Sequence, residues 1–561
     1  MTVSADLAGL PIFERSGVRA NLDVVVTPAA SSLHQQSPTT LSESVVLCPE
    51  KEDGTKRFSL VSEEADVRRI VGAIGPTLLA LGLFGADETV FHPNIPKVWD
   101  DRAVETMEVP LAQRDRSPRY MTSAEYYTLK VRPIYRSYPA YAKGREPAGY
   151  LESLKEKEPE IIFDPAKLHT KEDWIQAGKL VFEAETQFRP APAAQPSADE
   201  VSAQPVGKDG VLPFFRPGFR YYVRKKGVLE VGINACAGCH TRVMPDGSFF
   251  EGGQGYPDPP VSEATLLTIL ESTPEAFQKR TDRLWIRIGA PWVMSKEDFE
   301  RSLTKEELVH RIRASQPWVF TRQGTSDTHP VRIPSLVGIA DIRYLDATGL
   351  VRNRSIGDVM RYAALNEGLD TLAHFGDFQP APGATIFSGD EGTRYSDEQL
   401  YALALYIESL RPPPNPNKFD EHARRGQQIF KDEGCPVCHT PPLYTNNKLN
   451  PARGFKVPDD LRKTDDIMNT SVGTDPTLAL KTRRGTGFYK VPSLRGLWYR
   501  EGFGHGGQAA TLEEWFDPAR LEDGYVPKGF HLVPGPIEGH EKGLDLSADE
   551  KRDLIAFLKT L

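Results

Sequence analysis

The pattern Cys-x-x-Cys-His occurs twice in this chain of 561 residues, at 236–240 and at 435–439, and it uses four of the five cysteines. Two cysteines at this spacing can form thioether bonds with the vinyl groups of a porphyrin, and the adjacent histidine can ligate the central iron. The sequence therefore predicts two covalently bound haem c groups. The predicted attachment residues are Cys236, Cys239, Cys435 and Cys438, and the predicted iron ligands are His240 and His439.

Paired cysteines have other uses, which the spacing disfavours here. Two Cys-x-x-Cys pairs can hold one tetrahedral zinc ion, but the spacer in such sites is usually short, whereas Cys239 and Cys435 are far apart in the chain. Thioredoxin-like dithiol motifs use the same spacing without requiring a histidine after the second cysteine. The fifth cysteine, Cys48, adjoins no histidine or basic cluster, so we interpret it as incidental.

The composition is that of a soluble globular protein with long irregular connections. Hydrophobic residues make up 39% and charged residues 26% of the chain, and there are 46 prolines and 46 glycines. The net charge of −9 argues against binding to nucleic acid, which requires a basic surface. At this length the chain can form two or more domains, each with its own core.

Thioether attachment takes place outside the cytoplasm, so we looked for an export segment. Residues 1–66 are polar and are interpreted as a leader or a misassigned start. Two arginines then precede an apolar run at 70–86, which is typical of a signal peptide or signal-anchor at 67–86, although a buried helix is the alternative. We therefore expect a periplasmic or extracytoplasmic protein, with residues 70–86 as a membrane anchor where they are not removed.

The second half of the sequence repeats the order of features in the first half. An apolar helical pattern at 175–182 precedes the first motif, and a matching pattern at 423–430 precedes the second. A Pro-Ser-Leu segment follows each motif, at 334–336 and 492–494. Each half then closes with an amphipathic helix that begins at a capping box, Ser-x-x-Gln or Ser-x-x-Glu. The four capping-box residues are Ser396, Gln399, Ser547 and Glu550.

This repeat predicts a mainly α fold with two cytochrome c-like helical domains and long irregular connections. The first domain is expected at 171–410 and the second at 418–561, joined by a proline-rich linker. The first domain carries an insertion with a small β-hairpin, whose turn we place at 225–227. Residues 87–170 are expected to form an N-terminal extension that wraps the core.

The ligand on the second axial side of each iron decides its chemistry, because Met or His favours electron transfer and an open position allows oxygen or peroxide to bind. In the second half, His505 lies in a glycine-rich loop after the Pro-Ser-Leu segment, and we predict it as the sixth ligand. His540 and Met468 are alternative ligands, and His505 could instead hydrogen-bond a haem propionate or a backbone group.

The matching position in the first half is Ala347, and its loop contains no His or Met, so we expect the first iron to be open. Four residues could still fold back onto that iron. They are Met294, His310, Met360 and His374.

Three segments carry a resemblance to a known family: GQQIFKDEGCPVCHT, YKVPSLRGLWYREGFGHGGQAATLEEWF and LDLSADEKRDLIAFLKTL. The second half resembles the C-terminal domain of the dihaem cytochrome c peroxidase and MauG superfamily through these segments, and the first half resembles it more loosely. The wide separation of the motifs is similar to the layout of the dihaem rubber oxygenase branch. The resemblance implies a haem oxidoreductase that acts on peroxide or dioxygen.

The sequence departs from the family at two places. Members usually carry a Met ligand after the Thr-Leu-Glu-Glu helix, but 511–518 contains none, so the resemblance implies His505 as its replacement. A peroxidatic site also needs an acid near the first haem, and no motif identifies one, although Tyr362 is in place to lie over that haem. The acids in range by sequence are Asp298, Glu300, Glu306 and Glu307.

We therefore predict an exported dihaem cytochrome c whose first haem reacts with peroxide or dioxygen and whose second haem relays electrons. A small redox protein or a quinol-linked donor or acceptor is the expected partner. The alternative functions are a non-catalytic electron carrier with two six-coordinate haems and a haem-bearing sensor. A calcium ion occurs in related peroxidases, but no acidic loop in this sequence indicates one.

Overall fold

The computed structural model describes two compact units, residues 1–89 and residues 90–561. In the first it describes the backbone of four strands, and in the second it describes all residues except 143, 192–210, 213–219, 256–262, 322–324, 326 and 382–392. Strand β1 (Thr2–Asp6) pairs antiparallel with β2 (Asn21–Val25), and β3 (Cys48–Glu52) with β4 (Thr55–Ser59). The apolar run predicted for export, 70–86, lies outside the described residues.

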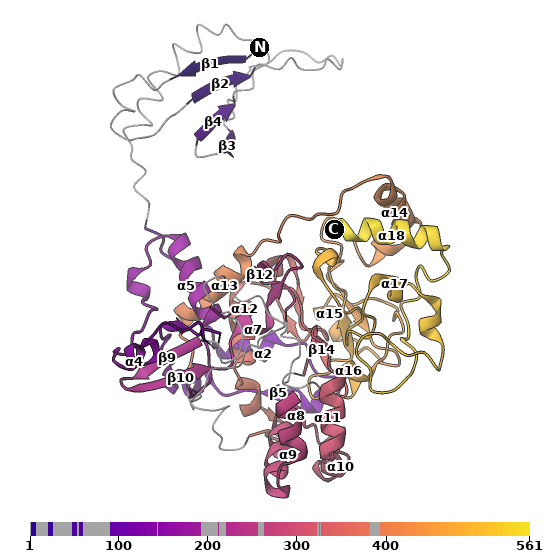
Figure 1. Cartoon of the computed structure of the whole chain (residues 1–561). Helices are drawn as coiled ribbons and strands as arrows, with labels where there is room; N and C mark the ends of the chain where they lie inside the picture. The colour runs from indigo at the N-terminus through magenta and orange to yellow at the C-terminus, as the bar shows by residue number, and fades with distance from the viewer. Residues whose placement is uncertain are drawn as a thin grey trace. The chain divides into compact units, whose positions relative to one another are not determined.

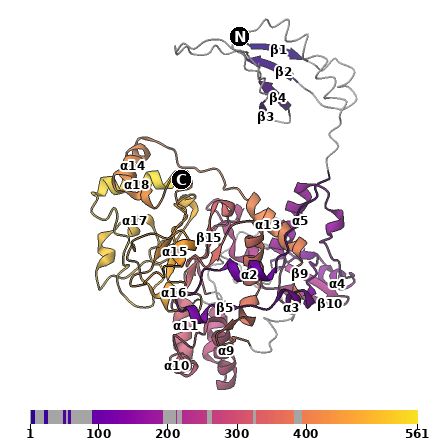
Figure 2. The same cartoon turned by 180° about the vertical axis from the view of Figure 1, so that it is seen from behind.

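The second unit is mixed and mostly helical, with small sheets (Figures 1 and 2). Its α-helices are α2 (Asp101–Met107), α3 (Ser123–Thr128), α4 (Tyr150–Lys155), α5 (Lys171–Glu183), α7 (Cys236–Cys239), α8 (Glu263–Leu270), α9 (Pro274–Ile288), α10 (Lys296–Arg301), α11 (Lys305–Ala314), α12 (Ile356–Asn366), α13 (Asp397–Ser409), α14 (Glu421–Asp432), α15 (Leu461–Thr464), α16 (Thr477–Leu480), α17 (Leu512–Trp515) and α18 (Ala548–Lys559). Among the described residues, no helix is both long enough and apolar enough to span a membrane.

The strands of this unit are short, and most of them form two-stranded ladders. They are β5 (Pro118–Arg119), β6 (Lys130–Val131), β7 (Ser137–Pro139), β8 (Phe188–Pro190), β9 (Arg220–Lys225), β10 (Val228–Gly232), β11 (Thr241–Val243), β12 (Phe249–Glu251), β13 (Val319–Phe320), β14 (Val331–Arg332), β15 (Tyr344–Leu345), β16 (Val351–Arg352), β17 (His374–Phe375), β18 (Thr393–Arg394), β19 (Leu449–Pro451) and β20 (Phe488–Lys490). The sequence predicted one hairpin. The long connections form further ladders because partly buried backbone needs hydrogen-bond partners.

The predicted hairpin is confirmed: β9 and β10 pair antiparallel on either side of a turn at 226–227. It is the centre of a four-stranded sheet with the order β7-β9-β10-β8. Strand β7 belongs to the N-terminal extension and pairs with β9, while β8 follows α5 and pairs with β10. The sheet therefore ties the extension to the segment that leads into the first motif.

Two helix pairs have the same local packing, α5 with α13 and α14 with α18 (Figures 1 and 2). Both predicted capping boxes are present, at the N-termini of α13 and α18. A Cβ added to Gly178 of α5 would lie 1.9 Å from the carbonyl oxygen of Ala402, and a Cβ added to Gly426 of α14 would lie 1.9 Å from that of Asp553. The two glycines occupy matching places in the sequence repeat, so each pair depends on a glycine that lets the helix backbones approach closely.

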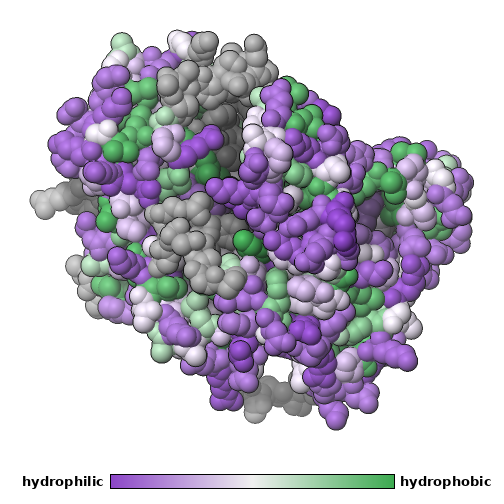
Figure 3. Space-filling model, turned by 90° about the horizontal axis from the view of Figure 1, so that it is seen from below, coloured by the Kyte–Doolittle hydropathy of each residue, from purple (hydrophilic) through white to green (hydrophobic). Residues whose placement is uncertain are grey.

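The N-terminal extension contributes to the larger core. Val98, Trp99, Met107 and Tyr126 are buried with side chains from α5, α12 and α13. A separate cluster of buried residues joins α14 and α18 to the segment that contains α17. Hydrophilic residues dominate the face seen from below, where hydrophobic residues occur in small scattered groups (Figure 3).

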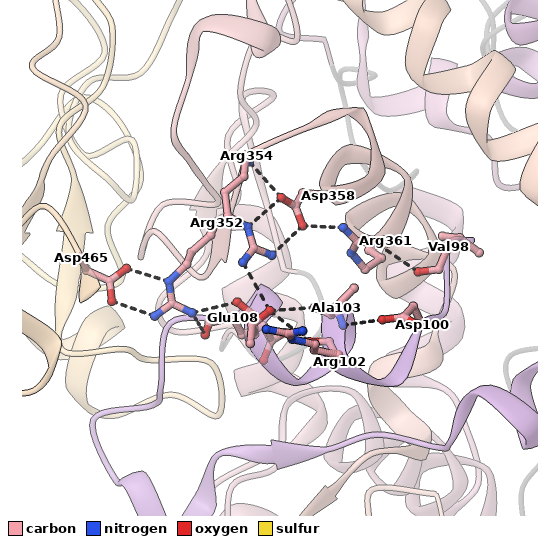
Figure 4. A network of polar contacts seen from close by, with 11 residues as sticks. Val98, Asp100, Arg102, Ala103, Glu108, Arg352, Arg354, Asp358, Arg361 and Asp465 are labelled. Carbon is pink, nitrogen blue, oxygen red and sulfur yellow. Dashed lines mark hydrogen bonds and ion pairs between the residues drawn. The ribbon is translucent and has the colours of Figure 1, made fainter. Parts of the chain in front are cut away.

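Two ion-pair systems hold the extension and the two halves together. Figure 4 shows Arg352 between Asp465 and the backbone near Glu108. Its guanidinium makes two bonds of 2.7 Å to the buried Asp465 and also donates to the carbonyl oxygen of Thr106 at 3.0 Å. Asp358 in α12 accepts hydrogen bonds from both Arg354 and Arg361 (Figure 4).

Two consecutive arginines from the second half are also buried. Arg484 pairs with Glu108 of the extension at 3.1 Å. Arg483 donates to the carbonyl oxygens of Ile286 and Arg287, each at 2.8 Å, and so satisfies the C-terminus of α9. A charge at this end of a helix is favourable because the C-terminus carries the negative end of the helix dipole.

We predict that Gly178→Ala and Gly426→Ala each destabilise the protein by about 1–3 kcal/mol, because the added methyl group must push two packed helices apart. The measurement is the free energy of unfolding by chemical denaturation. Gly524→Ala is the control, since nothing lies within 4 Å of a Cβ at that exposed position. Equal stability of Gly426→Ala and the control would contradict the proposed close contact.

We also predict that Asp465→Ala costs about 3–5 kcal/mol, because it leaves the largely buried guanidinium of Arg352 without its carboxylate. The neighbouring Asp466 supplies a matched control, since its ion pair with Arg343 is largely exposed. Asp466→Ala should change the free energy of unfolding by about 0–1 kcal/mol. A similar loss in both variants would show that burial of the Arg352 pair is irrelevant.

Candidate haem-binding cavity

Both Cys-x-x-Cys-His motifs line one cavity of about 830 Å³ in the second unit. The structure brings together all eight residues predicted for the two sites, since every one of them lines this cavity. They are Cys236, Cys239, His240, Tyr362, Cys435, Cys438, His439 and His505. The four motif cysteines are free thiols, so none is committed to a disulfide.

Nδ1 of each motif histidine forms a hydrogen bond to a backbone carbonyl, which helps to orient the ring. Nδ1 of His240 donates to the carbonyl oxygen of Pro334 at 3.2 Å, and Nδ1 of His439 donates to that of Tyr444 at 3.1 Å. A carbonyl can only accept, so the proton of the neutral ring is on Nδ1 and the lone pair is on Nε2. Burial lowers the pKa of His439 to about 4, and nearby His540 lowers it further, which keeps the ring neutral. This tautomer is the one that can ligate a metal through Nε2.

His540 lies beside His439, with ring centroids 6.3 Å apart and ring planes at 53°. Two imidazoles on opposite sides of one metal, each with a metal–nitrogen bond of about 2 Å, place their ring centres roughly 6 Å apart. Nδ1 of His540 is buried and has no hydrogen-bond partner among the described residues. The spacing of the two rings therefore fits an iron ion between them.

The backbone at His540 is strained and is held by a buried arginine. Its φ of 48° is unusual for a residue other than glycine. Arg520 donates to the carbonyl oxygens of Gly539 and His540 at 2.9 and 3.0 Å, and the amide of His540 donates to Val472 at 2.7 Å. Strain maintained by the surroundings is typical of functional positions. Position 540 is thus built to present its side chain to the cavity.

His505 has different surroundings. Its ring stacks on Tyr489, with centroids 4.2 Å apart and planes at 16°. Burial lowers the pKa of His505 to about 4, and His329 lowers it further while Asp475 opposes the shift. In the described part of the chain, the ring of His439 contacts His540 and makes no such contact with His505. His505 remains a predicted ligand by sequence, but its ring lies flat against a tyrosine.

Two arginines in the cavity lack negative partners. Burial lowers the pKa of Arg332 to about 9, and the neighbouring charge of Arg500 adds to the effect. Burial also lowers the pKa of Arg500, as does the charge of Arg495. Arg332 donates to the carbonyl oxygen of Gly502 and Arg500 to that of Ser493, and no carboxylate of the described residues pairs with either arginine. The cavity therefore has an excess of positive charge, which suits the two carboxylates of a haem.

Helix α12 contributes the wall nearest the first motif. Tyr362 and Asn366, one helical turn apart, both line the cavity, and the hydroxyl of Tyr362 donates to Asp346 at 3.3 Å. Glu367, at the end of α12, pairs with Arg132 at 2.8 Å, and both are largely buried in the cavity wall. These groups can donate or accept protons beside a ligand of the first iron.

The acids expected from the sequence are elsewhere in the described structure. Asp298 and Glu300 belong to α10, Glu306 and Glu307 to α11, and none of the four lines the cavity. Asp298 accepts a hydrogen bond from the helix-capping Ser295 at 2.7 Å, and Glu307 pairs with Arg311. The alternative first-haem ligands are also absent from the described wall. These are Met294, His310, Met360 and His374.

Sequence reasoning missed the charged groups of the wall, among them Arg132, Glu185 and Glu367. Glu367 could have been predicted from the sequence, because Tyr362 and Asn366 are four residues apart on one helix and Glu367 follows directly. Arg132 comes from the N-terminal extension, and no pattern connects it to a motif one hundred positions later. Glu185 follows α5, and no sequence pattern distinguishes it from other glutamates in loops.

The two motifs differ in exposure at single positions between their cysteines. Ala237 in the first motif is fully buried and Val437 in the second is 74% exposed, whereas all four cysteines are partly buried and His439 is more buried than His240. The first motif is covered by α5 and by the larger core, in which Cys236 and Ala237 pack. An external molecule can therefore approach the second motif directly.

Comparison with known proteins gives a limited similarity. No family model matches the chain. Over 140 residues it is 30% identical to the methylamine utilization protein MauG of Methylorubrum extorquens, which covers 25% of this chain and 34% of that protein. Hydrazine synthase of Kuenenia stuttgartiensis overlaps with 54% of this chain and 93% of that one at 15% identity, but the TM-score of 0.26 is too low to indicate a shared fold. The chain thus has distant similarity to MauG over about a quarter of its length.

The described residues contain no group of three or more His, Cys, Asp or Glu side chains placed to hold a metal ion. Each predicted iron position would instead use one or two histidines and the porphyrin nitrogens. The histidines close enough to act in this way are those of the two motifs and His540.

Proposed function

We propose that this protein is a dihaem c-type cytochrome of the peroxidase-like kind, exported from the cytoplasm. The observation that carries the proposal is that both motifs line one cavity with each histidine fixed in the metal-binding tautomer. The partial similarity to MauG supports the same function. Bound haem would supply the redox chemistry, including reaction with peroxide or dioxygen at an open iron.

The repeat supports a layout of two cytochrome c-like domains, 171–410 and 418–561. Each half has a helix with a close-contact glycine, a motif, a Pro-Ser-Leu segment and a closing helix. The helix pairs α5–α13 and α14–α18 would hold the two haem-bearing segments in equivalent places. The N-terminal extension would fasten the halves together through Arg352 and Arg484.

The first haem is the proposed reactive centre. Cys236 and Ala237 of its motif pack into the larger core, which limits the access of large molecules on that side. Tyr362, Asn366 and the pair Arg132–Glu367 line the same part of the cavity. The guanidinium of Arg132 can stabilise negative charge on a bound ligand, and the carboxylate of Glu367 can accept a proton from it.

The second haem is the proposed relay, with His439 and His540 as its axial ligands. The ring spacing, the unpartnered Nδ1 and the strained backbone support His540 over His505 for this role. Two imidazole ligands leave no open position, which suits electron transfer. Arg332 and Arg500 would hold haem carboxylates.

The exposed second motif is the proposed contact for a small redox protein or a quinol-linked donor or acceptor. Val437 presents an apolar surface directly over the attachment site. A periplasmic or other extracytoplasmic location follows from the chemistry of thioether attachment. The proposed export or anchor segment, 70–86, would deliver the chain there.

The test of this function is the mass and colour of protein matured in a host that assembles c-type cytochromes. We expect a mass excess of two haems that survives denaturation. The double variants Cys236→Ser/Cys239→Ser and Cys435→Ser/Cys438→Ser should each retain one haem. A high-spin ferric signal that shifts on addition of cyanide would support the open first iron.

A colourless polypeptide of unmodified mass would contradict the proposal. Two low-spin haems that bind neither cyanide nor peroxide would instead support the alternative function, a non-catalytic electron carrier.

The axial ligand has its own test. We predict that His540→Gly converts one of the two haems from low spin to high spin, and that added imidazole restores the low-spin spectrum by filling the vacated place. His505→Gly is the matched control and should leave the spin state unchanged. Electron paramagnetic resonance of the ferric protein distinguishes low-spin from high-spin haem. If only His505→Gly converts a haem to high spin, the axial ligand is His505 and not His540.

A further inference from the structure

Glu185 is a buried carboxyl in the cavity wall that the proposed function does not use. The residue is 5% exposed and lines the cavity close to the first motif. Its Oε2 atom has no hydrogen-bond partner among the described residues. A buried polar atom without a partner is costly, and such atoms in native proteins are associated with function.

The position of Glu185 is fixed by the strand that leads into the first motif. The amide of the next residue, Thr186, donates to the carbonyl oxygen of Asn234 at 2.7 Å. A Cβ added to Gly232 would lie 2.2 Å from Cγ of Glu185, so the carboxyl side chain packs directly against this glycine. Asn234 is two residues before Cys236, which would carry one thioether bond to the first haem. The structure thus holds Glu185 close to the attachment point of that haem.

Few charges face this carboxyl. Burial raises the pKa of Glu185 to about 8, while a backbone hydrogen bond from Asn234 and the charge of Arg220 in β9 oppose the rise. Tyr222 in β9 and the thiol of Cys236 also interact with Glu185 electrostatically. Arg220 is bound to Ser137 through its guanidinium. Among the described residues, Glu185 therefore has no ion-pair partner, and its protonation responds to a change of charge nearby.

The first haem would be such a changing charge. Addition of one electron makes its surroundings more negative by one unit, and in a poorly solvated site this charge favours protonation of a neighbouring carboxylate. We propose that Glu185 binds one proton when the first haem gains one electron and releases it when that haem is oxidised. The inference rests on the proposed function, in which the redox partner supplies the electron, and water supplies the proton.

The direction of the pH effect follows from this coupling. Below about pH 8 the carboxyl is protonated in both redox states, so the reduction potential of the first haem does not change with pH. Above that pH the oxidised protein loses the proton and the reduced protein binds it again. A higher pH then favours the oxidised state, and the potential falls.

The experiment is a spectroelectrochemical titration of the haem-loaded full chain between pH 6 and pH 10. We expect one of the two haems to show a constant potential below about pH 8. Above this value its reduction equilibrium should fall by up to tenfold for each pH unit, which is about 59 mV for a one-electron couple. In Glu185→Gln, which keeps the size but cannot titrate, the potential of this haem should be independent of pH.

Glu183→Gln is the matched control, because Glu183 lies two residues earlier and its half-buried carboxylate has an ion-pair partner, Lys179 at 3.5 Å. It should keep the pH dependence of the unmodified protein. Gly232→Ala keeps the carboxyl group of Glu185 but moves it. This variant should therefore shift the pH at which the potential of the first haem begins to fall. An identical slope in the unmodified protein and in Glu185→Gln would overturn the proposal.

A second measurement protects the test against a variant that does not fold. Reduction of the unmodified protein in weak buffer at pH 9 should take up close to one proton for the electron that enters the first haem, followed with a pH indicator. No uptake would overturn the inference even if the two haems are present. A colourless protein would contradict the proposed function itself, whereas a haem-loaded protein without proton uptake would contradict only the role of Glu185. The two failures are therefore distinguishable.

Discussion

The hydrogen bond from Nδ1 of each motif histidine to a backbone carbonyl is the constraint on which the rest of the site depends. It places the ring proton on Nδ1 and leaves the metal-binding lone pair on Nε2. The two carbonyls come from different places: Pro334 lies 94 positions after His240, whereas Tyr444 lies five positions after His439. The first histidine is therefore oriented by a distant segment, and the second by its own loop together with the backbone at Pro492. Covalent attachment alone would not fix either ring.

Charge is distributed in the cavity in a way that fits an anionic macrocycle. Arg500 lies close enough to lower the pKa of Arg332, and neither arginine has a carboxylate partner among the described residues. Other buried arginines have structural partners: Arg484 pairs with Glu108, and Arg483 donates to the carbonyl oxygens at the end of α9. Two arginines without a carboxylate in one cavity suit a negative ligand there. The buried carboxyl of Glu185, whose Oε2 atom has no partner among the described residues, gives the same cavity a titratable group.

Much of the local structure could be predicted from the sequence, because it depends on short-range rules. The capping boxes at Ser396 and Ser547 and the hairpin turn near Gly227 follow from residues within a few positions of each other. The roles of Arg132 and Glu185 could not be predicted, since each reaches the cavity through a fold that joins distant segments. The sequence also leaves open the choice between His505 and His540 as ligand. A glycine-rich loop shows that the backbone can approach a haem closely, but it does not fix the distance from a histidine ring to the iron. The strained backbone of His540, held by Arg520, is visible only in three dimensions.

The difference in exposure between the two motifs shows how a repeated sequence can acquire two functions. Both motifs have the same spacing and adjoin equivalent helix pairs, so local sequence alone gives them equal access to solvent. The first half carries the insertion that includes β9 and β10, and its motif packs into the larger core, where Ala237 is fully buried. The second half lacks an insertion at this point, and Val437 remains at the surface. The proposed division into a relay and a reactive centre would then depend on the insertion and on the core that surrounds the first motif, without any change in the attachment chemistry.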